Sequence, residues 1–184
     1  MSVTTTKTPS IYVGTYAKYN NGSLFGEWLN LIDYSDKDEF YEACKELHND
    51  EDDPEFMFQD YEHIPKFLIS ESHISEKAFE YFTALDELDE DRKAGFEIYI
   101  NFIKTTSNEE IEIGEEIDNF DTCYEGYFKG FTPKADFVCQ YVENGNYFEG
   151  NSEFMQRYFD YDKLENDLFL DGFTEYNGHI FSDN

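Results

Sequence analysis

Basic residues are scarce in this sequence. Of its 184 residues only 13 are Lys or Arg, and only Arg92 and Arg157 carry a guanidinium group. Proteins that bind nucleic acids or anionic membranes neutralise phosphates with clustered Lys and Arg. Neither nucleic acid nor a membrane surface is therefore expected as a direct partner of this chain.

Long apolar segments and paired cysteines are also missing. No run of about 18 apolar residues occurs, and residues 1–10 contain no apolar stretch of the kind found in signal peptides, so a cytoplasmic location is expected. The three cysteines, Cys44, Cys123 and Cys139, have no CxxC spacing. An odd number without that spacing favours reduced thiols over disulfides or zinc ligands.

The sequence lacks motifs that would indicate an enzyme or a metal site. Asp89 and Asp91 begin a calcium-loop pattern, but Lys93 and Ala94 stand where an oxygen ligand and the required Gly belong. Residues 91–93 match the D-x-K letters of a nuclease core, yet they fall in a predicted helix or its connection. The four histidines show no HExxH or other paired spacing. We therefore expect no catalytic residue, no metal and no cofactor.

Acidic and aromatic residues are abundant. The chain has 42 Asp plus Glu, a net charge of -29, and 19% aromatic residues. Disordered acidic tails are poor in aromatics, so this composition predicts a folded protein. Because self-repulsion of such a charge destabilises any compact state, the charge either serves a function or reflects adaptation to high salt. Ordinary solvated helix faces are a third interpretation at this point.

Apolar periodicity predicts a mixed α+β protein. A β-hairpin with a two-residue turn at Asn21-Gly22 is expected over residues 11–31, and a second around Asn177-Gly178 over residues 173–181. Thr132 and Pro133 are predicted to start a helix that buries Ala135, Val138, Cys139 and Val142. A strand is predicted at 55–59 and a short helical segment from 64. Helices are predicted at 35–48 (capped by Ser35), at 75–88, after the acidic connection 86–91 through Ile98, Phe102 and Ile103, and at 108–121, 152–158 and 160–170.

Several of these helices are predicted to expose a face made almost entirely of carboxylates. Residues 105–128 contain no base. Carboxylates at i and i+4 stand about 6 Å apart, comparable with neighbouring phosphates, and the net charge of this chain matches roughly 50 Å of duplex DNA. The carboxylates predicted to contact a partner are Glu39, Glu42, Glu46, Glu76, Glu80, Asp86, Glu87, Asp89, Glu90, Asp91, Glu109, Glu110, Glu112, Glu115, Glu116, Asp118 and Asp121.

The segment PSIYVGTYAKYNNGSLFGEWLNL, Pro9 to Leu31, closely resembles the opening of the ArdA antirestriction proteins, which mobile genetic elements carry into bacteria. Residues 56–65 (FMFQDYEHIP) and the ending from Tyr161, including residues 177–181, resemble the same family. The likeness spans nearly the whole chain, although the acidic middle matches by character more than by letters.

The resemblance implies an elongated α+β molecule of three small domains. They are a small antiparallel sheet plus helix at 1–70, a helical middle domain at 71–104, and a mixed α/β domain at 105–184 that dimerises. Such a protein would curve like bent B-DNA, bind the methyltransferase core of Type I restriction-modification enzymes, and block cleavage and methylation. The second hypothesis is an acidic interaction module that binds basic DNA-binding proteins in general.

Overall fold

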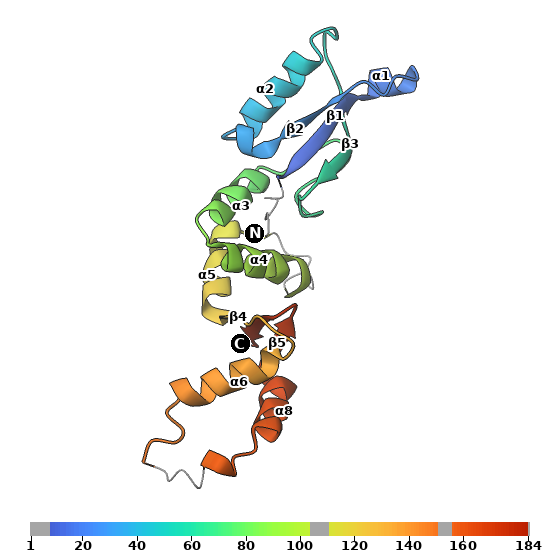
Figure 1. Cartoon of the computed structure of the whole chain (residues 1–184). Helices are drawn as coiled ribbons and strands as arrows, with labels where there is room; N and C mark the ends of the chain where they lie inside the picture. The colour runs from blue at the N-terminus through green and yellow to red at the C-terminus, as the bar shows by residue number, and fades with distance from the viewer. Residues whose placement is uncertain (1–7, 104–110, 151–155, 184) are drawn as a thin grey trace, which may run out of the picture. The chain divides into compact units, whose positions relative to one another are not determined.

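The structure is a computed structural model that describes residues 8–103, 111–150 and 156–183. The chain divides into two compact units, Met1–Leu85 and Asp86–Asn184, and each contains a three-stranded antiparallel sheet with helices (Figure 1). The α+β fold class predicted from the sequence is therefore confirmed. The division into three domains at residues 70 and 104 stays a prediction. In the described ranges, none of the helices combines the length and the hydropathy that a membrane crossing requires.

The N-terminal sheet has the strand order β2-β1-β3. Its strands are β1 (Ser10–Thr15), β2 (Glu27–Asn30) and β3 (Phe56–Glu62). The predicted pairing of β1 with β2 is confirmed, but the two-residue turn at Asn21-Gly22 is wrong. A short helix, α1 (Tyr16–Asn20), lies between the two strands. The side chain of Thr15 caps it by accepting a hydrogen bond from the backbone N–H of Lys18 at 3.3 Å.

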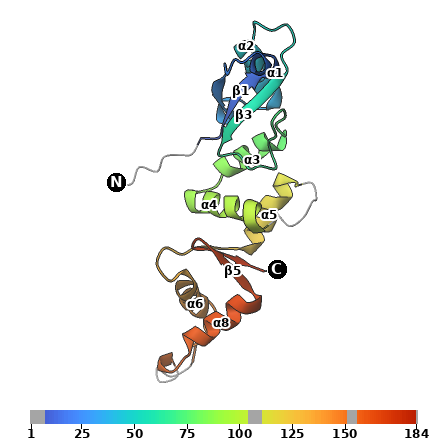
Figure 2. The same ribbon diagram turned by 90° about the vertical axis from the view of Figure 1, so that its right-hand side faces the viewer.

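Helix α2 (Lys37–Leu47) covers one face of this sheet (Figures 1 and 2). Its N-cap is Asp36, one residue after the predicted Ser35, and the Asp36 carboxylate accepts a hydrogen bond from the Glu39 N–H at 2.9 Å. Phe40 is fully buried, and its ring lies 5.9 Å from that of Phe58 on β3. Alternation along the strand and the helical repeat together place a core between α2 and the sheet.

The remaining elements of the N-terminal unit are the 3₁₀ turn η1 (Leu31–Asp33) and helix α3 (Lys77–Asp86). Helix α3 confirms the helix predicted at 75–88, and it buries Ala78, Phe79, Tyr81 and Leu85. The helical segment predicted from Ile64-Pro65 is wrong, because residues 66–68 form only a turn. The backbone N–H of Leu68 donates to the carbonyl of Pro65 at 2.9 Å, which closes this turn.

The C-terminal unit begins with helices built around stacked aromatic rings. These elements are α4 (Glu90–Ile98), the π-helical turn η2 (Tyr99–Ile103), α5 (Ile113–Cys123) and strand β4 (Tyr124–Tyr127). The Phe120 ring lies 5.3 Å from Phe96 and 4.6 Å from Tyr124, so α4, α5 and β4 share one core. Of the helix predicted at 108–121, residues 113–121 are confirmed as helical, whereas the described residues 111–112 precede the helix.

The second sheet has the order β4-β6-β5 and packs against two helices. Its further elements are α6 (Pro133–Asn144), α8 (Tyr161–Asp171), β5 (Phe173–Tyr176) and β6 (His179–Ser182). The predicted closing hairpin is confirmed: Asn177 and Gly178 have φ values of 52° and 85°, as a type I′ turn requires.

Two details of this second core differ from the prediction. Cys139, expected on the buried face of α6, is exposed, while Phe137 is only 4% exposed and packs against Phe169 and Phe173. A bulky ring fills the space between helix and sheet better than a thiol does. The helix predicted at 152–158 lies largely outside the described residues.

Candidate functional site

Fourteen of the seventeen predicted contact carboxylates have exposed side chains. They are Glu39, Glu42, Glu46, Glu76, Glu80, Asp86, Glu87, Asp89, Glu90, Asp91, Glu112, Glu115, Asp118 and Asp121. Glu109 and Glu110 lie outside the described residues. On α2, Glu42 and Glu46 are one helical turn apart, on the side of the helix away from buried Phe40 and Cys44. The helix core therefore holds a carboxylate pair outward.

Glu116 differs from the other predicted carboxylates. It is only 5% exposed and lies with Ile113 and Phe120 on the buried face of α5. The hydroxyl group of Tyr99 donates a hydrogen bond to Glu116 Oε2 at 2.8 Å. Burial, together with this bond, raises the pKa of Tyr99. Glu116 is therefore a polar residue of the core, and its predicted exposure on a contact surface is wrong.

Some exposed carboxylates already have structural tasks. The Glu39 carboxylate accepts hydrogen bonds from the backbone N–H and the hydroxyl of Ser35, both at 2.7 Å, and these bonds lower the pKa of Glu39. Together with the Asp36 cap they form a reciprocal capping arrangement at the start of α2. Asp89 caps α4 by accepting from the Arg92 N–H at 2.9 Å.

Other predicted carboxylates pair with bases of the chain itself. Lys93 Nζ lies 3.8 Å from Asp86 Oδ1 and 3.6 Å from Glu90 Oε1, and the Arg92 guanidinium pairs with Asp121. Because these pairs lie at the surface, each is worth about 0 to 1 kcal/mol. A stronger cationic partner can therefore displace them at little cost.

A cluster that the sequence analysis did not identify surrounds Lys18. Its ammonium lies 2.7 Å from Asp50 Oδ1, 3.4 Å from Glu51 Oε1 and 2.9 Å from Nδ1 of the buried His48. The pKa of Lys18 is raised: burial lowers it, but the bonds to the two carboxylates outweigh burial. The bond to Lys18 lowers the pKa of Asp50.

The ligand atoms of His48, Asp50 and Glu51 all lie within 4.8 Å of one another, a spacing that could hold a metal ion. The Lys18 ammonium contacts all three, so it supplies the positive charge that such a group requires. Sequence reasoning missed this arrangement because Lys18 and His48 are 30 residues apart and match no motif.

A comparison with known protein families identifies the family of this carboxylate-rich chain. Residues 11–181 match the sequence model of the antirestriction protein family ArdA. The chain belongs to the ArdA family. Membership implies antirestriction activity aimed at Type I restriction-modification, and ArdA antirestriction proteins are inhibitors without enzymatic activity. No match to a curated protein was found.

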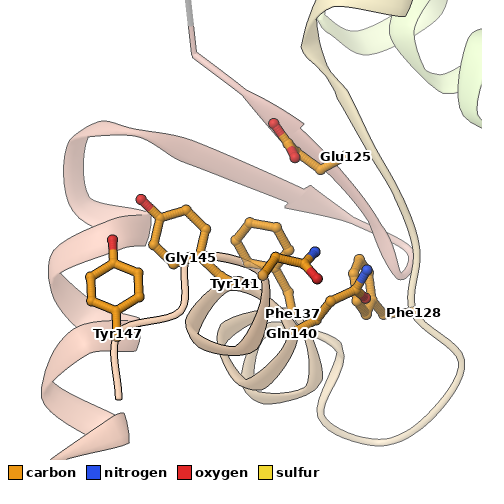
Figure 3. Close-up of a pocket in the computed structure, with 8 residues that line it drawn as sticks. Glu125, Phe128, Phe137, Gln140, Tyr141, Gly145 and Tyr147 are labelled. Atoms are coloured by element: carbon orange, nitrogen blue, oxygen red, sulfur yellow. The ribbon is translucent and has the colours of Figure 1, made fainter. Parts of the chain in front are cut away.

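The C-terminal unit of this ArdA protein also contains a cavity of about 380 Å³ (Figure 3). Aromatic rings form much of its wall, and the rings of Tyr141 and Tyr147 lie 5.9 Å apart. Its residues are Glu125, Phe128, Phe137, Gln140, Tyr141, Asn144, Gly145 and Tyr147. Glu125 is the one carboxylate among them, and this lining offers no nucleophile paired with a base.

Proposed function

We propose that this ArdA protein inhibits a Type I restriction-modification enzyme as a DNA mimic. Its exposed carboxylates occupy the DNA-binding groove of the methyltransferase core, and this blocks both cleavage and methylation. The observation that carries the proposal is the placement of the fourteen exposed carboxylates on helices α2 to α5, at the residues just before α3 and α5, and in the α3–α4 connection. Packed aromatic cores hold these groups outward.

Carboxylates can replace phosphates because both are anionic hydrogen-bond acceptors for Lys and Arg. A groove evolved to bind DNA gathers such cations at a spacing suited to the DNA backbone, and helical i and i+4 carboxylates such as Glu42 and Glu46 lie about 6 Å apart. Long-range attraction between the acidic inhibitor and the basic groove also accelerates their association, and this attraction weakens as salt is added. Recognition in this mechanism depends on backbone charge and shape, without a nucleotide sequence.

The proposal includes a homodimer that assembles through the C-terminal part of the chain, residues 105–184. Its support is the resemblance to ArdA proteins stated above. A dimer doubles the carboxylate surface and covers about twice the length of DNA. The inhibitor acts in the cytoplasm, where the restriction enzyme meets incoming DNA.

The direct test is a pull-down with a purified Type I methyltransferase, with and without competitor duplex DNA. We expect selective capture that the DNA reverses. A panel of unrelated basic proteins of similar net charge serves as the control. Equal capture of the whole panel would instead support the general acidic interaction module, and no capture of the methyltransferase would contradict DNA mimicry.

Cluster neutralisation tests the role of the carboxylate faces. The double variant Glu42→Gln with Glu46→Gln removes two charges from α2 and keeps the capping residue Glu39. We expect inhibition of the methyltransferase to weaken roughly 3- to 30-fold, since each surface pair contributes up to about 1 kcal/mol. The measurement is the inhibitor concentration that halves DNA methylation.

The matched control neutralises Asp162 and Asp167 to Asn. Both are exposed on α8, outside the predicted contact set, and the change in net charge is the same. We expect this control to retain nearly full inhibition. Equal losses in both variants would show that net charge alone matters, and complete loss from one single substitution would argue against a distributed mimic.

A further inference from the structure

The N-terminal sheet has a second face, opposite the one that α2 covers. Ile11 and Val13 of β1 are fully buried on the α2 side, so alternation places Tyr12 on the other side. Tyr12 is paired with Trp28 of β2 and with Asp60 of β3. These three residues form one cross-strand row, which we call the outer face.

The two rings of the outer face are fixed in place. The Tyr12 and Trp28 centroids are 5.6 Å apart at an interplanar angle of 67°, an edge-to-face contact. The Tyr12 hydroxyl donates to the backbone carbonyl of Leu24 at 3.1 Å. Trp28 nevertheless remains 43% exposed. A fixed indole that stays in contact with water loses little conformational entropy when a partner covers it.

Carboxylates adjoin these rings, and none of the three strands contains Lys or Arg. Asp60 is exposed beside Tyr12, and Glu62 is exposed two residues further along β3. An aromatic ring next to a carboxylate is the environment that a guanidinium prefers, because it can stack on the ring and form two hydrogen bonds with the carboxylate.

The chain uses this chemistry for its own bases. Lys18 Nζ lies 4.8 Å from the centroid of the Phe25 ring, and the Arg92 guanidinium lies 5.4 Å from that of Phe120. Among the described residues, no Lys or Arg is placed in this way over Trp28. The most polarisable ring of the chain is thus open to a cation from another molecule.

We propose that the outer face binds Arg side chains of the basic DNA-binding surface of the Type I methyltransferase. This inference rests on the proposed function and adds a contact that DNA phosphates do not make. Charge complementarity selects the occupant: a second copy of this chain carries a net charge of -29 and only two Arg residues, so it is poorly suited to this face. A cationic groove satisfies both the rings and the carboxylates.

Fluorine NMR tests the proposal directly, because Trp28 is the one Trp of the chain. Protein labelled with 5-fluorotryptophan gives a single ¹⁹F signal from the outer face. Unlabelled methyltransferase is added, and complex formation is followed separately by gel filtration. We expect the signal to shift and to lose its sensitivity to the H₂O/D₂O exchange of the solvent. An unchanged signal in a formed complex would overturn the inference and leave DNA mimicry standing, whereas absence of a complex would refute the proposed function.

Substitutions then separate a ring contact from a charge contact. Trp28→Ala should weaken methyltransferase binding about 5- to 30-fold, and Trp28→Phe should retain most of the affinity. Because neither changes the net charge, the salt dependence of binding should stay parallel to that of the unmodified chain. Asp60→Asn should reduce that dependence.

Phe67→Ala is the matched control, since it removes another exposed ring of the N-terminal unit, on the turn at residues 66–68 outside the three strands. It should bind normally. Equal losses from Trp28→Ala and Phe67→Ala would overturn the proposal. A Trp28→Ala variant that changes oligomeric state while its methyltransferase binding is unchanged would overturn it too. Circular dichroism of Trp28→Phe and Trp28→Ala establishes that both variants are folded.

Discussion

At the scale of single residues, His179 is held in an environment that disfavours its charged form. It is 4% exposed on β6, its ring stacks 4.5 Å from that of Tyr127, and its Nδ1 lies 2.9 Å from the hydroxyl oxygen of Tyr124. Burial lowers the pKa of His179 below its usual value, although the nearby carboxylates of Asp91 and Glu175 oppose the shift. The folded protein therefore favours the neutral form of this imidazole over its protonated form.

This environment predicts a pH dependence of stability. Between the ordinary His pKa of 6.5 and the lower folded value, the unfolded chain binds a proton that the folded chain excludes. Stability contributed by neutral His179 is thus present above pH 6.5 and is lost as the pH falls. We expect the unmodified chain to lose stability relative to His179→Gln between about pH 8 and pH 5.5, measured by urea unfolding. Surface carboxylates titrate alike in the unmodified chain and in His179→Gln, so their contribution cancels. A difference in the free energy of unfolding that does not change with pH would contradict the prediction.

The carboxylates show what sequence can and cannot reveal about single residues. Helical carboxylates such as Glu42 and Glu46 are exposed because the 3.6-residue repeat assigns them to the side away from the apolar stripe, whereas Glu87 and Asp89 are exposed in the connection between α3 and α4. Glu116 breaks this rule since its position on the wheel is beside Ile113 and Phe120. Its partner Tyr99 is 17 residues away, and no local pattern predicts that contact.

At the scale of elements, alanine substitutions at two glycines in neighbouring helices are expected to change stability in opposite directions. A Cβ at Gly95 in α4 would lie 2.8 Å from a carbon of the Tyr124 ring, whereas a Cβ at Gly114 in α5 would meet nothing within 4 Å. We expect Gly95→Ala to destabilise the protein by about 1–3 kcal/mol through overpacking. Gly114→Ala should stabilise it by up to about 1 kcal/mol, because Ala favours the helix.

Urea unfolding measures both changes without altering ionic strength. Each variant serves as the control for the other, since the chemical change is the same. If Gly95→Ala were as stable as Gly114→Ala, the close packing of Tyr124 on α4 would be wrong.

Elements with local sequence signals are predicted more accurately than elements that depend on distant contacts, for a physical reason. Helices α2, α3 and α8 follow from apolar spacing and capping residues that are close in the sequence. Strand β4 was not predicted, because its four residues pair with β6, which lies more than 50 residues later. The two-residue turn predicted at Asn21-Gly22 is wrong because these residues follow the short helix α1. They do not connect two strands directly.

At the scale of the whole molecule, the net charge of -29 has opposite consequences for folding and for binding. Repulsion among the carboxylates destabilises the compact state, and salt screens that repulsion. We expect the melting temperature of the isolated protein to rise between about 0.05 and 0.5 M NaCl. KCl should act equally if the effect is screening. A melting temperature that falls with salt would contradict this account.

The same composition explains which functional conclusions the sequence alone supports. The acidic charge and the ArdA resemblance together indicate an antirestriction inhibitor, and the family match agrees. The outer face with Trp28 required the strand register, because Tyr12, Trp28 and Asp60 come from three separate segments.

Lys18 has a consequence for how this protein tolerates its surroundings. Clustered acids usually recruit counterions from the medium, so their geometry varies with the ions that happen to be present. The loop beside His48 instead carries a tethered cation, bonded to Asp50 and Glu51, at an effective concentration that dilution cannot lower. We therefore expect the N-terminal unit to hold Asp50 and Glu51 beside His48 without a divalent metal ion.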